Sequence, residues 1–380
     1  MGKTILFGEP MALLIADTTG PLENVEHFTR ALSGAEVNVS IGLTRLGHSV
    51  EYLTRLGDDP FGHYIAKTLG ENQIGISLLS YDPVYRTGIQ LKNRVTDGSD
   101  PYAPYYRKGS AASHISEKEI DAIDLTDVNL VHITGIPPAL SQSARKATFR
   151  LMQRAKDKGI FITFDPNLRP ALWENEETMR TVINELASMA DVVLPGIEEC
   201  KILLGTTDME EAAQMYQKAG AKIVIIKDGS KGAFVKENEN AYTVPGFHVD
   251  KVVDTVGAGD GFAVGVISGI LEGRTIKESV RRGNAIGAIQ VMNISDNEGL
   301  PTKEELDKYC NWFFHPKGDV SFPSKTSTQS LDSDDFAVFS DGSEISMDSF
   351  ASGESVGSVE SAEPVTSESE EVGEPIEIDD

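Results

Sequence analysis

The residues with the clearest chemical potential lie between positions 254 and 262, where the chain reads DTVGAGDGF. Three glycines within five positions, followed by a small-residue apolar segment, predict backbone amides that converge at a helix N-terminus and bind an anion. Asp260 stands where it could accept the proton of an attacking hydroxyl while the amides of residues 257–259 hold a phosphoryl group. The same residues suit a glycine-rich turn with a helix-capping aspartate, so this motif alone leaves both interpretations open.

A second motif lies near the N-terminus, where residues 32–38 read LSGAEVN. Gly34 would let a ligand approach the backbone, and Asn38 lies one helical turn further along, on the same face. Taken alone, this segment is also typical of an ordinary Ser/Gly helix start.

The elements that position these motifs follow an α/β pattern, in which short apolar runs alternate with helix-period segments. The apolar spacing of Val39, Leu43 and Leu46 predicts a helix that Gly47 ends, and a second helix is predicted over residues 143–156. The apolar runs do not alternate with polar residues, which predicts parallel strands covered on both faces. These strands are expected at residues 4–7, 130–133, 161–164, 192–194 and 223–226.

Three short segments do not fit this alternation, namely residues 11–16, 86–93 and 103–108. Residues 96–101 join the second and third of these segments and have turn-forming composition. We interpret the three segments as a small accessory sheet, or lid, that covers a cleft. An exposed strand edge needs cover, so the lid also predicts pairing into a homo-oligomer.

The charge of the chain is unevenly distributed. Its 380 residues are 40% hydrophobic, enough for a sizeable core, and carry a formal net charge of −25. Residues 316–380 hold 17 acidic and two basic residues, so −15 of that charge lies in a Ser-rich segment that we expect to be disordered, with an unknown partner. The acidic balance excludes nucleic acid and anionic membranes as default partners.

Two distant cysteines, Cys200 and Cys310, provide neither a disulfide framework nor a zinc-binding spacing. The first apolar run is too short for a signal peptide, and no segment has the length of a membrane span. We therefore expect a cytoplasmic protein.

The pair of motifs, SGAEVN and DTVGAGDGF, resembles the two signatures of ribokinase-type (PfkB) carbohydrate kinases. The resemblance covers roughly residues 2–312, and two motifs about 220 residues apart are far more specific than either one. It implies a kinase domain over residues 1–312, with a Rossmann-like, mostly parallel sheet flanked by helices and a small β lid. ATP and Mg²⁺ are the implied cofactors, with K⁺ as an additional candidate.

The resemblance also implies nucleotide and metal roles. It places Glu199 in an indirect magnesium role, although Gly196 stands where the family has Asn, and it makes Asp254 a candidate monovalent-cation ligand. Residues 227–232 (KDGSKG) would form the nucleotide loop, but they equally suit a hairpin turn, and Asn284 equally suits a helix surface. The implied ATP-binding residues are Asn167, Lys227, Asp228, Gly229, Lys231, Gly232, Gly257, Ala258, Gly259 and Asn284.

Two further segments point to an acidic sugar. Arg107 ends the lid and Arg169 follows a buried strand, so together they could clamp a carboxylate, with Tyr105 as a hydroxyl donor. Alternatively, each arginine pairs with a carboxylate of this acidic protein. The motifs YxRxGSA and DPNLRP resemble the 2-keto-3-deoxygluconate kinase branch of the family. By that resemblance the sugar-acid ligands are Gly34, Asn38, Tyr105, Arg107, Arg169 and Asp296.

The expected reaction is ATP-dependent phosphorylation of the 6-hydroxyl of 2-dehydro-3-deoxy-D-gluconate, with Asp260 as general base. A P-loop and a protein-kinase HRD/DFG pair are both absent from the sequence. One alternative is a fructokinase or another neutral-sugar kinase of the same fold. The other is a non-catalytic sensor or scaffold that acts through its acidic segment.

Overall fold

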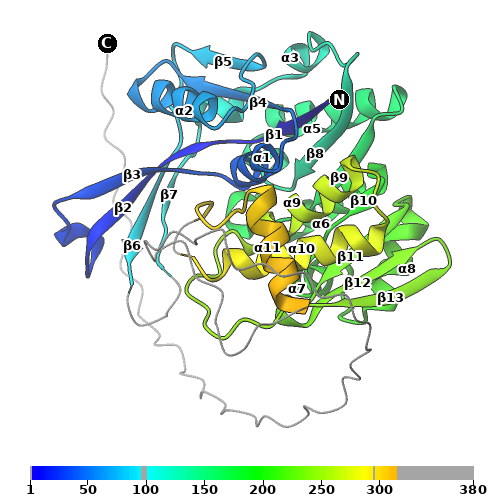
Figure 1. Ribbon diagram of the computed structural model, residues 1–380. Coiled ribbons are helices and arrows are strands. Elements are labelled where there is room, and N and C mark those ends of the chain that lie inside the picture. Colours follow the sequence, from blue (N-terminus) through cyan, green and yellow to red (C-terminus); the bar gives the residue numbers. More distant parts are fainter. Residues whose placement is uncertain (1, 96–100, 294–295, 315–380) are drawn as a thin grey trace, which may run out of the picture. The chain divides into compact units, whose positions relative to one another are not determined.

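The computed structural model describes residues 2–95, 101–293 and 296–314, all within one compact unit. The predicted acidic segment 316–380 and most of the predicted turn 96–101 lie outside the described residues. A nine-stranded sheet organises this unit, in the order β13-β12-β11-β10-β9-β8-β1-β4-β5 (Figure 1). Its strands are β1 (Lys3–Phe7), β4 (Val50–Gly57), β5 (Leu79–Asp82), β8 (Val128–Thr134), β9 (Phe161–Asp165), β10 (Val192–Val193), β11 (Ile223–Lys227), β12 (Gly232–Glu237) and β13 (Asn240–Pro245).

Seven of these strands, from β11 to β5 in the sheet order, pair in parallel. Five of them, β1, β8, β9, β10 and β11, were predicted from their unalternated apolar runs, whereas β4 and β5 were not. In β1, Leu6 belongs to one hydrophobic core whereas Ile5 and Phe7 belong to the other, because successive side chains of a strand point to opposite faces. Both faces of the sheet are therefore buried, which confirms the predicted α/β class.

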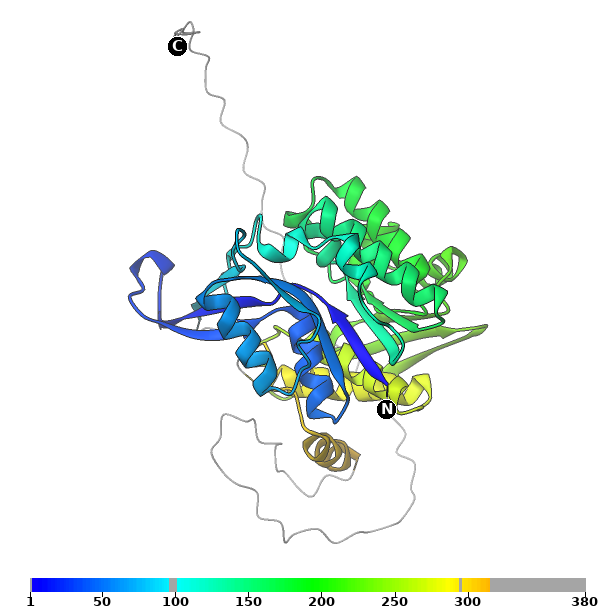
Figure 2. The ribbon, with the colours of Figure 1, turned by 90° about the horizontal axis from the view of Figure 1, so that it is seen from above.

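Helices cover the two faces of the sheet (Figure 2). The face reached by Leu6 packs against α1 (Ala35–Arg45), α2 (Pro60–Glu71), α9 (Ala258–Leu271), α10 (Ile276–Gln290) and α11 (Lys303–Phe314). The opposite face packs against α3 (Glu117–Asp121), α5 (Gln142–Asp157), α6 (Glu176–Met189), α7 (Ile197–Leu204) and α8 (Met209–Ala219). The helix predicted over residues 143–156 is α5. The earlier predicted helix is α1, and Gly47 follows it in a left-handed conformation with φ 89°.

The lid is a separate sheet of four strands, in the order β3-β2-β6-β7, which projects to one side in Figure 1. Its strands are β2 (Met11–Thr19), β3 (Phe28–Ser33), β6 (Ile89–Arg94) and β7 (Tyr105–Tyr106). Strand β3 was not predicted, and the strand expected at 86–93 begins only at Ile89. The reason for the late start is that Thr87 is bonded to the main domain, through its amide to Asp59 and its hydroxyl to the amide of Gly57.

The end of the main sheet beyond β11 is antiparallel, because β11, β12 and β13 form two successive hairpin pairs. Residues 227–232, the predicted nucleotide loop, are the connection between β11 and β12. This segment is therefore a hairpin connection, as the alternative interpretation of its sequence expected. No helix in the part of the chain that the structure describes is long and apolar enough to cross a membrane.

Candidate active site

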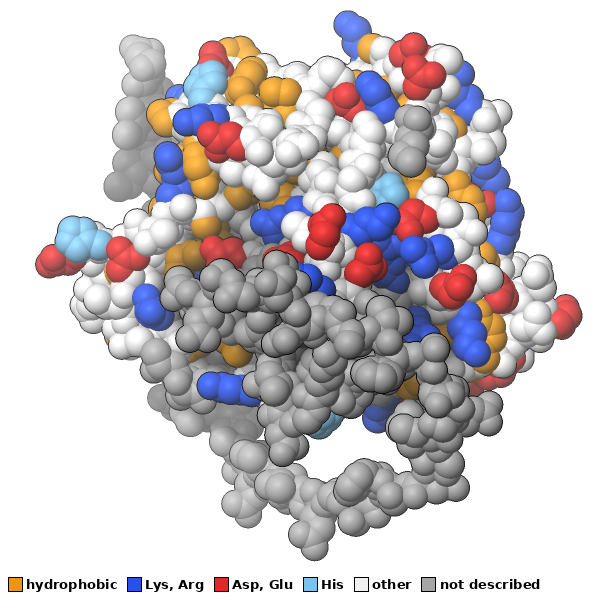
Figure 3. Space-filling model, in the orientation of Figure 1, with side chains coloured by type: hydrophobic (Ala, Val, Ile, Leu, Met, Phe, Trp, Pro, Cys, Tyr) orange, Lys and Arg blue, Asp and Glu red, His pale blue; other side chains and the backbone are white. Residues whose placement is uncertain are grey.

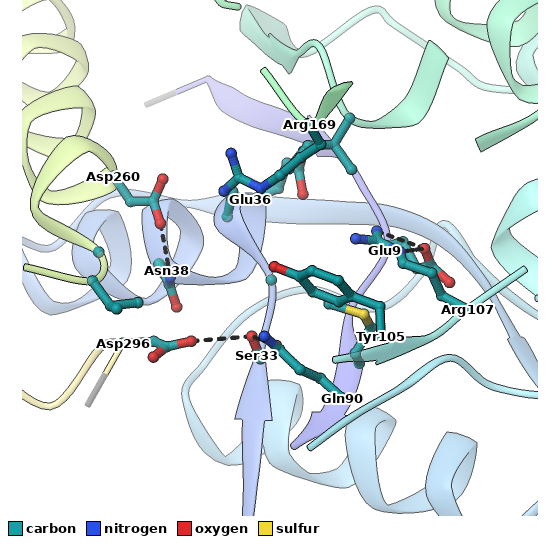
Figure 4. Close-up of a pocket in the computed structure, with 16 residues that line it drawn as sticks. Glu9, Ser33, Glu36, Asn38, Gln90, Tyr105, Arg107, Arg169, Asp260 and Asp296 are labelled. Atoms are coloured by element: carbon teal, nitrogen blue, oxygen red, sulfur yellow. Dashed lines mark hydrogen bonds and ion pairs between the residues drawn. The ribbon is translucent and has the colours of Figure 1, made fainter. Parts of the chain in front are cut away.

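The pocket that gathers the predicted residues lies where α1 and α9 begin and the lid meets the main sheet (Figure 4). About 500 Å³ of space free of protein atoms lies between its walls, and this figure includes open solvent at the mouth of the pocket. All six predicted sugar ligands line this pocket, together with Gly257 and Asp260. The lining residues are Glu9, Met11, Ser33, Gly34, Ala35, Glu36, Asn38, Gln90, Tyr105, Arg107, Ile136, Arg169, Val256, Gly257, Asp260 and Asp296.

Asp260 lies in the first turn of α9, where two side-chain amides orient its carboxylate. The amide of Asn38 donates to Oδ2 at 2.8 Å, and the amide of Asn167 donates to Oδ1 at 3.3 Å. Burial raises the pKa of Asp260 to about 6, while the hydrogen bond from Asn38 opposes that rise. The carboxylate is therefore ionised at neutral pH and close to the proton affinity that suits a general base.

The start of α9 requires glycine at position 257. Gly257 has φ 78°, and a Cβ there would lie 2.3 Å from the carbonyl oxygen of Asp296. The first amides of a helix lack intrahelical acceptors, so the amides of this turn are available to an anion. The amide of Ala258 also has a long, 3.3 Å bond to the carbonyl of Thr255, which leaves the amides of Gly257 and Gly259 as the better donors.

The two arginines of the expected clamp differ. Arg107 is buried, and its Nε and Nη2 atoms both lie 2.6 Å from Oε2 of Glu9, so this arginine pairs with a carboxylate of the protein. Arg169 is half-buried and donates from Nη1 to the backbone carbonyl of Leu168 at 2.9 Å. Among the residues that the structure describes, no carboxylate forms an ion pair with Arg169. Arg169 is therefore the stronger candidate for binding an anionic ligand.

Four polar lining residues were not predicted, namely Glu9, Ser33, Glu36 and Gln90, and a sequence signal exists for Glu9. Glu9 directly follows β1, and the carboxyl ends of parallel strands are where open α/β sheets bind ligands. Gln90 lies on the lid strand β6, with its side-chain amide 2.8 Å from the hydroxyl oxygen of Ser33. Glu36 is fully buried, accepts a hydrogen bond from the hydroxyl of Thr134, and has its pKa raised to about 7 by burial.

Lys227 joins this site from the end of β11. Its ammonium lies 2.6 Å from Oδ2 of Asp165, and a Cβ on Gly259 would lie 3.9 Å from it. Burial lowers the pKa of Lys227, but the Asp165 and Glu199 carboxylates more than compensate, so the lysine stays charged. The structure therefore brings Lys227 to the predicted anion site.

Glu199 is bound to backbone amides through both carboxylate oxygens. It accepts from Gly196 at 2.7 Å and from Leu168 at 2.8 Å, which makes it the capping residue at the start of α7. Both oxygens of Glu199 thus hold the backbone at the start of α7, and this structural role is compatible with an indirect magnesium role. In the described part of the chain, no group of three or more His, Cys, Asp or Glu side chains could hold a metal ion.

The remaining predicted nucleotide residues gather near the end of β13. Asn284 is buried and donates to the carbonyls of Val244 at 3.1 Å and Pro245 at 3.0 Å, so its interpretation as a surface residue was wrong. Gly232 packs against the same carbonyl of Val244. Asp228 pairs with the exposed Lys231, and Gly229 is also exposed. These residues form a second cluster, outside the sugar-sized pocket.

Comparisons with known proteins agree with this arrangement. Residues 1–303 match the model of the pfkB family carbohydrate kinases. The chain is 44% identical, over 81% of its length and 95% of the relative, to a 2-dehydro-3-deoxygluconokinase from Bacillus subtilis (strain 168). It is equally 44% identical to a PfkB protein of known structure from Polaromonas sp. JS666, over 81% of this chain and 99% of the other, with a TM-score of 0.74.

A fructokinase double mutant from Vibrio cholerae O395, solved with fructose, ADP and a potassium ion, is 27% identical over 81% of this chain and 98% of the other, with a TM-score of 0.72. The ribokinase-like fold and the shared motifs define a carbohydrate kinase. The chain belongs to the pfkB family of carbohydrate kinases.

Proposed function

We propose that this kinase transfers the γ-phosphoryl group of ATP to the 6-hydroxyl of 2-dehydro-3-deoxy-D-gluconate. One observation carries the proposal: Asp260, poised as a base, and Arg169, a guanidinium that forms no ion pair with a described carboxylate, line the same pocket. Figure 4 shows Arg169 extending over the pocket on the side of Asp260. A neutral sugar has no need of such a cation, whereas the carboxylate of a sugar acid does. The relative from Bacillus subtilis that is 44% identical to this chain is named a 2-dehydro-3-deoxygluconokinase.

In the proposed reaction the sugar hydroxyl loses its proton to Asp260 as its oxygen attacks the γ-phosphorus. The new bond joins that oxygen to phosphorus, and the bond between the γ-phosphorus and the bridging oxygen breaks to release ADP. The amides of Gly257 and Gly259 and the ammonium of Lys227 stabilise the charge that develops on the phosphoryl oxygens. Magnesium bound with the nucleotide would neutralise phosphate charge, and Glu199 would act indirectly by fixing the backbone at Leu168 and Gly196.

The lid has two roles in this proposal. It supplies Tyr105 and Gln90 to the pocket wall, and by covering the sugar it excludes water that would otherwise hydrolyse ATP. Its two edge strands, β3 and β7, also support a homo-oligomer formed through lid pairing. Light scattering tests the second role, and a monomeric mass at assay concentration would contradict it.

Arg169→Ala tests the sugar-acid proposal. Removing a charged group that binds an oppositely charged one costs about 2–5 kcal/mol, so kcat/KM for the sugar acid should fall at least about 30-fold. Arg150→Ala is the matched control, because Arg150 pairs with Asp121 on the exposed surface. The assay couples ADP formation to a signal for the sugar acid and for fructose in parallel. Unchanged turnover of the sugar acid by Arg169→Ala would refute the proposed clamp.

A neutral-sugar kinase is the second candidate, and the pairing of Arg107 favours it. Because Glu9 already neutralises Arg107, the pocket offers one unpaired guanidinium rather than the two expected from the sequence. The structurally similar fructokinase was solved with fructose bound. Preferential turnover of fructose over the sugar acid by the wild-type chain would establish this candidate instead.

A further inference from the structure

A buried lysine of the lid lies between two aspartates at the back of the active site. Lys92 is on β6, and its ammonium nitrogen lies 3.2 Å from Oδ2 of Asp254 and 3.2 Å from Oδ1 of Asp296. Lys92 and Asp296 are buried, and the side chain of Asp254 is 12% exposed. The three residues are far apart in sequence, so the lid, the segment before α9 and the segment after α10 meet at this one ammonium group.

Both aspartates hold the chain that forms the anion site. The other oxygen of Asp254 accepts the amide of Val256 at 3.0 Å, immediately before the start of α9. The backbone carbonyl of Asp296 packs against Gly257, and its Oδ2 accepts from the hydroxyl of Ser33 at 3.1 Å, next to Gly34. The position of Lys92 therefore affects the backbone on both sides of the pocket.

A cation is needed at this position for electrostatic reasons. Two carboxylates side by side repel each other, and they also repel the phosphates that the neighbouring amides attract. The ammonium of Lys92 forms an ion pair with each carboxylate, which places one positive charge between the two negative ones. One lysine thus neutralises part of the negative charge beside the anion site.

Asp254 is also the residue that the family resemblance made a monovalent-cation ligand, and the fructokinase relative holds a potassium ion. The residues here do not fit that expectation. The ammonium of Lys92 already contacts one oxygen of Asp254 and one of Asp296, so a cationic group occupies the space between the two carboxylates. A potassium ion at these carboxylates would have to displace Lys92. Lys92 is also not among the residues that line the pocket, so it is not a substrate ligand.

We propose that the Lys92 ammonium replaces a bound monovalent cation and that the lid thereby supplies the charge that orders the start of α9. Lys92 is a positioning residue, which acts through Asp254 and Asp296 and touches no reacting atom. The inference rests on the kinase activity of the family and not on which sugar is phosphorylated. It predicts a kinase that requires no potassium.

The experiment compares the full-length chain with Lys92→Ala and Lys92→Arg in potassium chloride and in choline chloride at equal ionic strength. Wild type should show the same melting temperature and the same turnover in both salts. Lys92→Ala should melt lower and lose at least tenfold in activity in choline chloride, and potassium should restore a large part of both. Lys92→Arg keeps the charge and should need no potassium.

Lys236→Ala is the matched control, since Lys236 is equally buried but pairs with Glu210 away from the pocket. It should show no potassium response in melting temperature or activity. Melting is measured without sugar or nucleotide, so this readout does not depend on the identity of the substrate. Three results would overturn the proposal: potassium activation of the wild type, full activity of Lys92→Ala in choline chloride, or a Lys92→Ala defect that potassium does not relieve. If Lys92→Ala does not fold in either salt, the wild-type comparison and Lys92→Arg still decide.

Discussion

Asp260 must be ionised to act as a base, although its burial in the fold favours the protonated form. The carboxylate must stay ionised to accept a proton, yet burial raises its pKa to about 6, which means that the folded protein binds a proton there more tightly than the unfolded chain. The contribution of Asp260 to the free energy of unfolding therefore falls as pH rises from about 4 through about 6, because the folded state must then hold a buried charge. The amides of Asn38 and Asn167 reduce this cost without removing it.

Asp260→Asn should accordingly separate activity from stability. Loss of the general base is expected to lower kcat about 10²- to 10⁴-fold, with little change in KM for the sugar, because the substitution keeps the shape of the side chain. The melting temperature at pH 7 should not fall, since a buried charge has been removed. Steady-state kinetics and thermal unfolding test both expectations. Asp121→Asn, on the exposed surface, is the control, and full turnover by Asp260→Asn would show that another group takes the proton.

The pH dependence of kcat/KM reports the same carboxylate in the free enzyme. Below a pH of about 6 the base becomes protonated, so kcat/KM should fall tenfold for each further pH unit. Glu36, whose pKa is raised to about 7, also lines the pocket and titrates nearby. Glu36→Gln distinguishes the two groups, since an acid limb near pH 6 that persists in this variant belongs to Asp260. A limb that disappears with Glu36→Gln would assign the titration to Glu36.

At the scale of elements, the lid is attached to the main sheet by a buried ion pair. Glu9 follows β1 and Arg107 follows β7, so their contact joins strand β1 of the main sheet to the lid. Removal of one member of a buried pair leaves an uncompensated charge, which costs far more than the pair itself contributes. The contributions of Glu9 and Arg107 to the free energy of unfolding are therefore expected to depend on each other.

A double-mutant cycle on Glu9 and Arg107 measures this dependence. Glu9→Ala and Arg107→Ala should each lower the free energy of unfolding by about 3–5 kcal/mol, and the double variant should lose much less than the sum. The measurement is urea unfolding followed by circular dichroism. The exposed pair Arg150 and Asp121 serves as the control, with an expected coupling of about 0–1 kcal/mol. Additive losses for Glu9 and Arg107 would mean that the pair does not fasten the lid.

Strands were predictable from the sequence where burial on both faces left a single clear signal, an unbroken apolar run. The strands at β1, β8, β9 and β11 are buried on both faces, so their apolar runs are unbroken and easy to read. Strand β3 (FTRALS) mixes exposed and buried residues without clear alternation, and β7 is only two residues long. The antiparallel strands β12 and β13 follow a turn that was interpreted as a nucleotide loop. These elements are specified by pairing partners that a local pattern does not contain.

The residues of the site also divide into those that local sequence predicts and those that it does not. Gly34, Asn38 and Asp260 lie in glycine-containing motifs whose local sequence carries their chemistry, and the structure places all three at the pocket. The partner of Arg107 could not be predicted, because Glu9 is 98 residues away and its pairing depends on how the lid meets β1. The contact between Lys92 and Asp296 spans 204 residues and has no local signature at all. Motifs identify residues, but tertiary contacts decide which charges remain unpaired.

At the scale of the whole molecule, the net charge is informative only when the acidic segment 316–380 and the residues before it are counted separately. Figure 3 shows acidic and basic side chains interspersed on the face in view, as on an ordinary protein surface. The first 315 residues carry a formal net charge of −10, although the substrates that we propose are both anions. Positive potential must therefore be local, from Arg169, Lys227 and the first amides of α9, while Lys92 neutralises the neighbouring carboxylates.

Deletion of residues 316–380 tests whether the acidic segment contributes to the kinase. The described residues that line the pocket all precede this segment, and its composition has too few large apolar residues to bury much surface. We therefore expect kcat and the melting temperature of the truncated chain to match those of the full-length protein. Removal of a net −15 should still weaken repulsion of anionic substrates at low salt, and this difference should vanish near 0.15 M salt, where the screening length is about 8 Å.

A variant that keeps the segment but replaces its Asp and Glu by Asn and Gln separates charge from chain length. It should reproduce the low-salt KM of the truncated chain. A lower melting temperature or a lower kcat after truncation, absent from the neutralised variant, would show that the segment packs against the kinase domain. In that case the chain would be one functional unit, and the acidic segment could no longer be treated as separable from catalysis.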